Sequence, residues 1–171
     1  LVTGTMTIDV AVSEDSAIQV EYTKDSQSKT VYYTGLDNDD RNNDHYWDVI
    51  SDLSSGYLNA DTNEPITVTL LDDITLADTT ILVDAGKKVT INGNGHTITA
   101  TMSSFAAAGK PGADAVSITN DSTLTLNNVK LNIKAADAVV LNGETSTQGI
   151  YNDGILTLTG GTQVTINGVS K

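Results

Sequence analysis

The chain has 171 residues, a formal net charge of −13, 39% apolar residues, 5% aromatic residues and no cysteine. This length suits one domain, with or without an appended subdomain, and the missing cysteine excludes disulfides, Cys-ligated zinc and thiol catalysis. Arg41 is the single arginine, so the sequence offers no cationic groove for nucleic acid, and no apolar run is long enough to span a membrane.

Residues 1–64 are expected to form a small β-rich region that leads into a connector. Segments 5–12, 17–23 and 29–34 alternate apolar and polar residues over a strand length, which predicts a β meander. Segment 45–54 predicts a short helix, because Trp47, Ile50 and Leu53 recur at helical spacing and Gly56 follows as a stop signal. We expect this helix to cap the end of the structure that follows.

Residues 65–171 contain an internal repeat. Three segments align without gaps, starting at residues 83, 118 and 150: VDAGKKVTIN, ITNDSTLTLN and IYNDGILTLT. Each begins with an apolar residue (Val83, Ile118 and Ile150) and carries an apolar-Thr-apolar strand after a polar turn. The alignment adds three further columns. One precedes each unit and contains Ile81, Val116 and Gln148. Two follow it: one contains Ile98, Ile133 and Ile166, and the other contains Thr97, Asn132 and Thr165.

These units predict a β-solenoid. Each is too short to bury its own apolar face, so stacking in register must supply both the core and the hydrogen bonds between strands. A β-sandwich is the other architecture that short alternating strands allow, but it gives no reason for turn chemistry to repeat at fixed offsets. Segments 66–71 and 74–76 would form the first rung, and the long stretches 101–115 and 142–148 would be insertions at turns.

The run 64–99 resembles the entry of pectate-lyase-like β-helix proteins. The resemblance lies in PITVTLLDDITL (65–76), KKVTINGNGHTIT (87–99) and the later strands, and it covers about the last two-thirds of the chain. It implies an all-β fold: a right-handed parallel β-helix over 65–171, truncated, preceded by a β-rich region and a short capping helix over 1–64. We expect the chain to be a fragment of a longer bacterial surface protein.

For function, the first expectation is a non-catalytic extracellular module, adhesin-like and secreted or held at the bacterial cell surface. Its partner would be a host or environmental glycan or a surface protein, and an exposed end rung would allow self-association. The first alternative is a fragment of a β-helix polysaccharide lyase or hydrolase, and the second is an ice-binding or spacer solenoid. No catalytic residue is assigned, and the sequence leans away from an enzyme.

Three groups of residues are candidates for binding. Aromatic platforms for sugars would come from Tyr32, Tyr33, Tyr46, Tyr57 and Tyr151. Calcium, the one cofactor considered, would bind the acidic run of Asp37, Asp39, Asp40 and Asp44, which lacks the Gly and distal Glu of an EF-hand. An exposed ladder would stack Thr90, Thr125 and Thr157, although threonine is also an ordinary exposed strand residue.

Other reactive residues favour structural roles. Asp72 and Asp73 form an acidic pair that would cooperate in catalysis only at a bend, since neighbouring strand residues face opposite ways. His96 lies in a glycine turn without an evident partner, and His45 and Ser103-Ser104 match no catalytic motif.

Overall fold

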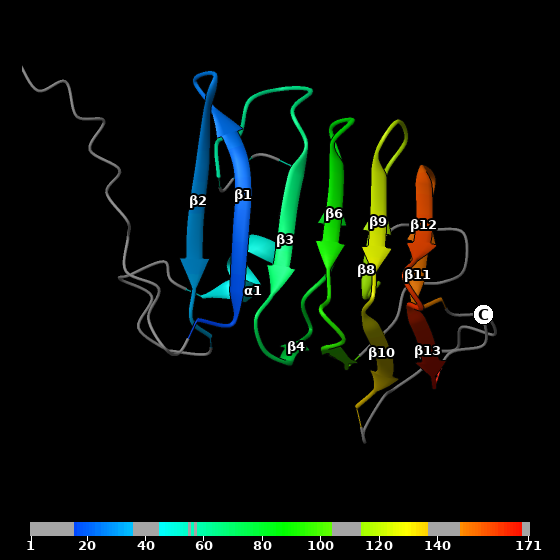
Figure 1. The fold of residues 1–171 in the computed structure, drawn as a ribbon. Coiled ribbons are helices and arrows are strands. Elements are labelled where there is room, and N and C mark those ends of the chain that lie inside the picture. Colours follow the sequence, from blue (N-terminus) through cyan, green and yellow to red (C-terminus); the bar gives the residue numbers. More distant parts are fainter. Residues whose placement is uncertain are drawn as a thin grey trace, which may run out of the picture.

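The computed structural model describes residues 16–35, 45–54, 56, 58–103, 114–136 and 148–168. These residues form three parallel sheets that wrap around one core, with an antiparallel hairpin and a short helix at the N-terminal side (Figure 1). The prediction of a parallel β-helix is therefore confirmed. The predicted first strand at 5–12 and most of the two predicted insertions lie outside the described residues.

The N-terminal elements are β1 (Ile18–Lys24), β2 (Gln27–Tyr33) and α1 (Tyr46–Ile50). The coils that follow contain β3 (Ile66–Leu70), β4 (Ile74–Ala77), β5 (Ile81–Val83), β6 (Lys88–Asn92), β7 (Thr97–Met102), β8 (Val116–Ile118), β9 (Thr123–Asn127), β10 (Lys130–Ala135), β11 (Ile150–Asn152), β12 (Ile155–Thr159) and β13 (Gln163–Asn167).

From β3 onward, successive strands belong in turn to sheets A, B and C, so every third strand lies in the same sheet. Sheet A has the order β12-β9-β6-β3-β1-β2, sheet B the order β13-β10-β7-β4, and sheet C the order β11-β8-β5. All pairs between coils are parallel, whereas β1 pairs antiparallel with both β2 and β3. Each coil therefore passes through A, B and C before the chain rises to the next coil.

Alternation of side chains along the strands builds the core. In β3, Ile66, Val68 and Leu70 are fully buried, while the two threonines between them are half-buried on the outer surface. The same alternation in β6 and β9 places valine, isoleucine and leucine inside and threonine and asparagine outside. Because aromatic residues are scarce, stacked aliphatic side chains fill the interior.

At sheet C the register confirms one predicted pair and corrects the others. Val83 pairs with Ile118 as predicted, but Ile118 pairs with Asn152, and Ile150 pairs with Val116. The cause is a shorter turn, because residues 153–154 span the connection that residues 119–122 make in the coil before. The column predicted for Gln148 is therefore occupied by Ile150, which restores an apolar residue there.

A second correction concerns sheet B. Residues 128–129 make the turn that residues 93–96 make in the preceding coil, so Ile98 pairs with Leu131 rather than Ile133. For the same reason Thr97 pairs with Lys130. Thr99 pairs with Asn132, the position that the alignment predicted for Thr97. An ungapped alignment misses both corrections because the two changes in length lie inside turns.

Glycine makes the short turn at 153–154 sterically feasible. A Cβ atom on Gly154 would lie 2.6 Å from the Thr119 carbonyl oxygen and closer still to that of Ser122. Backbone cannot yield as a flexible side chain would, so only glycine lets the turn settle on the coil below.

We expect Gly154→Ala to lower the free energy of unfolding by roughly 1–3 kcal/mol, the usual cost of overpacking, as measured by urea denaturation. The control is Gly161→Asn, since Gly161 has φ +77 and nothing within 4 Å of an added Cβ, and asparagine tolerates this conformation. Equal stability of Gly154→Ala and the parent chain would contradict the turn packing.

The N-terminal elements cover the first edge of all three sheets. The hairpin β1–β2 pairs with β3 through residues 18–21 of β1. The Tyr46 hydroxyl of α1 donates to the Thr75 carbonyl oxygen of β4 at 2.8 Å and accepts from the Thr75 N–H at 3.1 Å. Beyond α1, the Leu53 N–H donates to the Leu82 carbonyl oxygen of β5 at 2.9 Å.

The predicted capping role of this segment is thus carried by backbone and by Tyr46. Trp47 is only partly buried and packs against the core from its margin, whereas Tyr46, Val49, Ile50 and Leu53 are buried. The cap satisfies strand groups that would otherwise form an open edge.

A second tie joins the hairpin to the coils. The Asp61 carboxylate accepts hydrogen bonds from the N–H groups of Asp25 and Ser26 at the tip of the hairpin, at 2.9 and 2.8 Å. The buried Lys87, which precedes β6, donates through Nζ to the Asp61 carbonyl oxygen at 2.5 Å. One residue of the connector therefore holds both the hairpin tip and the second coil.

Replacing Tyr46 with phenylalanine tests how much the hydroxyl group of the cap contributes to the free energy of unfolding. Tyr46→Phe leaves the N–H and C=O of Thr75 without their partner, and we expect a loss of about 1–3 kcal/mol of unfolding free energy. Tyr22→Phe is the matched control, because the Tyr22 ring is also partly buried against the core while its hydroxyl makes no hydrogen bond among the described residues. Equal urea midpoints for the two variants would contradict a stabilising role of the Tyr46 hydroxyl in the cap.

Candidate functional site

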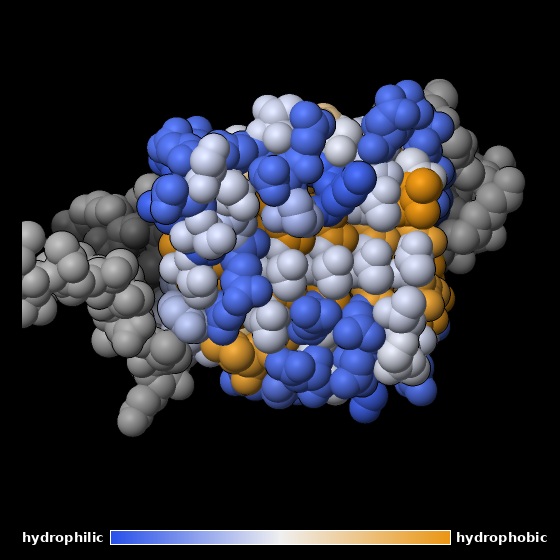
Figure 2. Space-filling view, turned by 45° about the horizontal axis from the view of Figure 1, so that its top comes forward, coloured by the Kyte–Doolittle hydropathy of each residue, from blue (hydrophilic) through white to orange (hydrophobic). Residues whose placement is uncertain are grey.

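The outer face of sheet A carries a continuous row of threonines. Thr67, Thr90, Thr125 and Thr157 pair in register across β3, β6, β9 and β12. Figure 2 shows a pale band crossing these strands between strips of apolar residues. Sequence alignment predicts the last three members, and the structure adds Thr67, which the alternation in ITVTL could have indicated.

The hydroxyl groups of this threonine row are available to a ligand. Among the described residues none of the four makes a side-chain hydrogen bond. The row is half-buried at its first three positions and exposed at Thr157. Strands in a sheet lie about 4.8 Å apart, so the row presents one methyl and one hydroxyl at that interval.

The neighbouring row is bonded to itself instead. Thr69, Asn92, Asn127 and Thr159 stand in register beside the threonine row. Asn127 donates through Nδ2 to Asn92 Oδ1 at 3.1 Å, and the Thr159 hydroxyl donates to Asn127 Oδ1 at 3.2 Å. This amide ladder fixes its own side chains and stiffens the border of the threonine row.

The hairpin extends the same face. Register places Glu21 of β1 beside Thr67, and Thr30 of β2 beside Glu21. A hollow of about 340 Å³ lies here, lined by Glu21, Tyr22, Thr23, Ser28, Lys29, Thr30, Pro65 and Thr67. These residues could not be predicted as neighbours, because nothing in the sequence indicates that β1 pairs with β3.

The predicted tyrosine platforms do not gather at one place. Tyr33 is 8% exposed and Tyr46 is 5% exposed, so burial in the core leaves neither ring face open to a sugar. Tyr32 is half-buried on the outer row of sheet A beside Gln19, and Tyr151 is half-buried on sheet C beside Ser117. Tyr57 lies outside the described residues.

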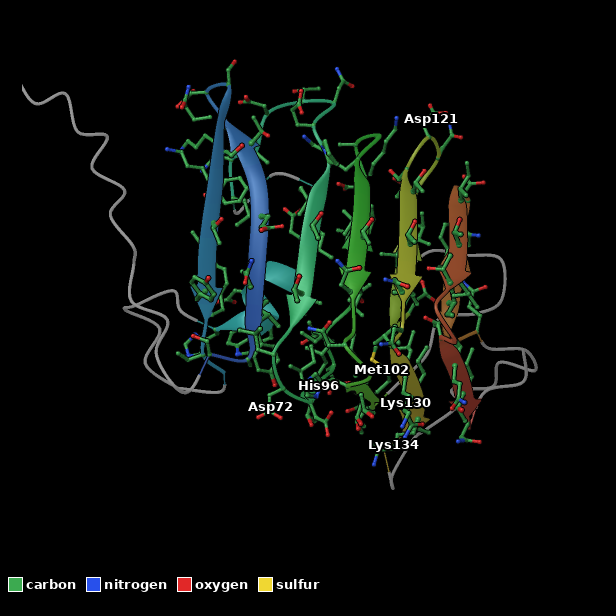
Figure 3. All side chains as sticks on the ribbon, in the orientation of Figure 1. Asp72, His96, Met102, Asp121, Lys130 and Lys134 are labelled. Carbon is green, nitrogen blue, oxygen red and sulfur yellow. The ribbon has the colours of Figure 1, made fainter. Side chains whose placement is uncertain are left out.

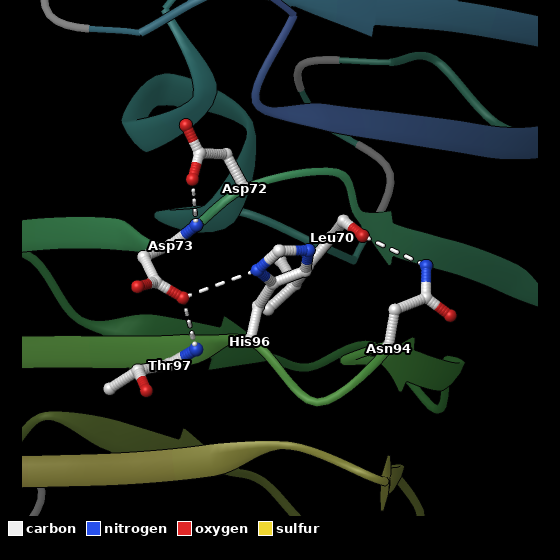
Figure 4. Close-up of polar contacts among 6 residues, drawn as sticks. All are labelled: Leu70, Asp72, Asp73, Asn94, His96 and Thr97. Carbon is white, nitrogen blue, oxygen red and sulfur yellow. Dashed lines mark hydrogen bonds and ion pairs between the residues drawn. The ribbon is translucent and has the colours of Figure 1, made fainter.

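The acidic pair predicted near a rung forms a turn that joins two coils. Asp73 Oδ1 accepts from the Thr97 N–H at 2.8 Å and lies 3.2 Å from His96 Nδ1, while Asp72 Oδ1 accepts from the Asp73 N–H at 2.7 Å (Figure 4). From the facing turn of the next coil, which also carries His96, Asn94 Nδ2 donates to the Leu70 carbonyl oxygen at 2.9 Å.

This arrangement favours the unprotonated form of Asp73. The Thr97 N–H is the main cause of a pKa below the ordinary value for Asp73, and His96 and Lys130 add to it (Figure 3). A general acid needs the opposite shift, so the cluster suits a structural clamp better than catalysis. Asp78 makes a similar clamp, because its carboxylate accepts from both the N–H and the hydroxyl of Ser103 at 2.6 Å, and its pKa is also lowered.

Acid should release the Asp73 clamp. A carboxyl group whose folded pKa is depressed stabilises the fold above its unfolded pKa of about 3.8, and this contribution is lost as pH falls through the lower folded pKa. We therefore expect Asp73→Asn to be less stable than the parent chain near pH 6, and the difference to shrink below pH 3.8.

Urea midpoints between pH 2 and 7 would measure this difference. Asp72→Asn is the control, because among the described residues the Asp72 carboxylate bonds only within its own turn. A difference for Asp73→Asn that stays constant down to pH 2 would rule out the clamp.

Of the remaining sequence candidates, His45 forms no site among the residues that the structure describes. His45 is 1% exposed, its Nδ1 lies 3.7 Å from Asp48 Oδ2, and its Nε2 has no hydrogen-bond partner among the described residues. The described part of the chain holds no cluster of three metal-ligating side chains. The predicted calcium ligands Asp37, Asp39, Asp40 and Asp44 lie outside it.

Comparisons with known proteins return no match: no family model, no curated protein and no solved structure resembles the chain significantly. Within the described residues, no helix has the length and apolar character needed to cross a bilayer. The threonine row and the hollow beside it are therefore the candidate functional surface of the described chain.

Proposed function

We propose that this chain is a non-catalytic extracellular module of a bacterial surface protein, of the pectate-lyase-like β-helix class, and that it binds a glycan along the outer face of sheet A. The observation that carries the proposal is the threonine row, whose four hydroxyls are in register and unbonded within the described chain. The resemblance of segments 65–76 and 87–99 to β-helix surface proteins supports the class.

A glycan suits this face in chemistry and in repeat. Sugar polymers present hydroxyl groups at regular intervals, and each threonine hydroxyl can both donate and accept a hydrogen bond. From Thr30 on β2 to Thr157 on β12 the face crosses six strands, which is about 24 Å at the usual strand spacing. The stacked coils hold the row in place before binding, which lowers the entropy cost of association.

The charge of the chain narrows the class of glycan. A net charge of −13 disfavours sulfated or uronic-acid polymers at moderate ionic strength, because like charges repel over about 10 Å. We therefore expect a neutral glycan.

Ice binding is the second candidate, and the same free threonine row favours it. A flat array of threonines could order water at the strand spacing. The adjoining outer row works against this function, because Lys88 and Ile155 project there on either side of Thr123. Thermal hysteresis of the purified chain would decide the matter, and its presence would displace the glycan proposal.

A fragment of a polysaccharide-cleaving enzyme is less well supported. The acidic pair of the described coils, Asp72 and Asp73, is engaged by backbone N–H groups in a turn. The other described candidate base, His96, is held against Asp73.

Valine substitution tests the threonine row directly. Thr90→Val/Thr125→Val removes two hydroxyls, keeps the side-chain shape and suits a strand. At about 0.5–1.5 kcal/mol for each hydrogen bond, neutral hexasaccharides that bind the parent chain on a glycan array should bind this variant roughly 5- to 150-fold more weakly.

The matched control is Thr99→Val/Thr165→Val, on the outer face of sheet B. It should bind like the parent chain. Unchanged binding by Thr90→Val/Thr125→Val, or no binding of any hexasaccharide by the parent chain, would overturn the proposed function.

A further inference from the structure

The hollow beside the threonine row differs from the rest of sheet A in shape and charge. It lies where the antiparallel strands β1 and β2 join the parallel strand β3. Two-stranded antiparallel ribbons twist more strongly than central parallel strands. Beyond Glu21, where the pairing with β3 ends, β1 and β2 continue as such a two-stranded ribbon, and the hollow lies beside it.

The side chains that line the hollow come from both sets of alternating positions on its strands. Glu21, Thr30 and Thr67 are register neighbours on the outer face, and Thr23, Ser28 and Pro65 share that face by period-two spacing. Tyr22 and Lys29 occupy the alternate positions and pair with one another. The hollow has two charged lining residues, Glu21 and Lys29, of which the register places Glu21 on the outer face.

The Glu21 carboxylate is oriented and has spare capacity. Gln19 donates through Nε2 to Glu21 Oε1 at 3.1 Å, and Glu21 Oε2 has no hydrogen-bond partner in the described chain. An ionised carboxylate offers about four acceptor positions and no donor. It therefore prefers a ligand with neighbouring hydroxyl donors and repels one that carries a carboxylate.

We infer that this hollow is a subsite for one neutral sugar ring at the end of the bound glycan, with Glu21 accepting hydrogen bonds from two adjacent hydroxyl groups of that ring. The inference rests on the proposed function, because the rest of the glycan lies along the threonine row. The volume of about 340 Å³ is near the lower limit for small-molecule sites, about 300 Å³, which suits one ring. The hydroxyls of Thr23, Ser28, Thr30 and Thr67 surround the ring and make no side-chain hydrogen bond within the described chain.

Removing the charge while keeping the shape provides the test. The probes are neutral hexasaccharides and uronic-acid hexasaccharides of the same linkage, titrated by isothermal calorimetry against the folded chain. Glu21→Gln should weaken binding of the best neutral hexasaccharide about tenfold, the difference between one charge-assisted and one neutral hydrogen bond. It should also raise the affinity for the uronic-acid hexasaccharide, so the neutral-to-uronate affinity ratio falls.

Asp121→Asn is the control for net charge. Asp121 is exposed in the turn before β9, away from the hairpin (Figure 3), and its φ of 63 suits asparagine. It should leave the neutral-to-uronate ratio at the parent value. A ratio that falls equally in both variants would reduce the effect to overall charge and overturn the subsite.

The outcomes separate this inference from the proposed function. If the neutral hexasaccharide binds, Thr90→Val/Thr125→Val weakens it and Glu21→Gln does not, the threonine row stands and the subsite is wrong. If no hexasaccharide binds the parent chain, the proposed function fails and the subsite fails with it. Circular dichroism confirms that Glu21→Gln is folded before titration, and Glu21→Asp, which keeps the charge, should recover part of the ratio.

Discussion

Pairing between coils is the constraint on which this structure depends. No coil can bury its own apolar residues or satisfy its own backbone, so each strand needs a partner in the coil before it and in the coil after it. Val89, Leu124 and Leu156 stack inside sheet A because their strands pair in register. The same register aligns the outer threonines, so the core and the proposed binding face arise from one set of hydrogen bonds.

Turns absorb the differences in length between coils without disturbing that register. Two connections shorten, at residues 128–129 and 153–154, yet the strands on both sides stay aligned. Different residues support different turns: the Asp73 carboxylate joins the turn before β4 to the next coil, and Gly154 allows the shortened turn at 153–154 to pack against the preceding coil. Turns can therefore vary in sequence while the sheets keep their spacing.

Core positions could be predicted from the sequence where they follow a periodic pattern. Strand partners could not be predicted where they depend on pairing between segments far apart in the chain. The apolar-Thr-apolar strands predicted the core positions and the stacking of Thr90 on Thr125, because period-two alternation is local. The partners of Ile150 could not be predicted, since a shortened turn shifts its register by two residues. Alternation in KTVYY marks a strand, but it does not show that Tyr33 lies inside.

The same limit applies to the candidate site. Glu21 and Thr30 become part of the outer face only through the antiparallel pairing of β1 with β3, which links segments far apart in sequence. Neither residue stands out by composition, and no motif surrounds them. The threonine row could be predicted from the repeat, whereas the hollow at its end had to be seen in three dimensions.

The tie through Asp61 and Lys87 has a mechanical consequence. Asp61 grips the hairpin tip with its carboxylate while its carbonyl oxygen accepts from Lys87 at the start of the second coil. A load applied to the hairpin is therefore shared between strand β3, with which β1 pairs, and the second coil. Under such a load, the end of the solenoid that bears the hollow would unfold together with the second coil.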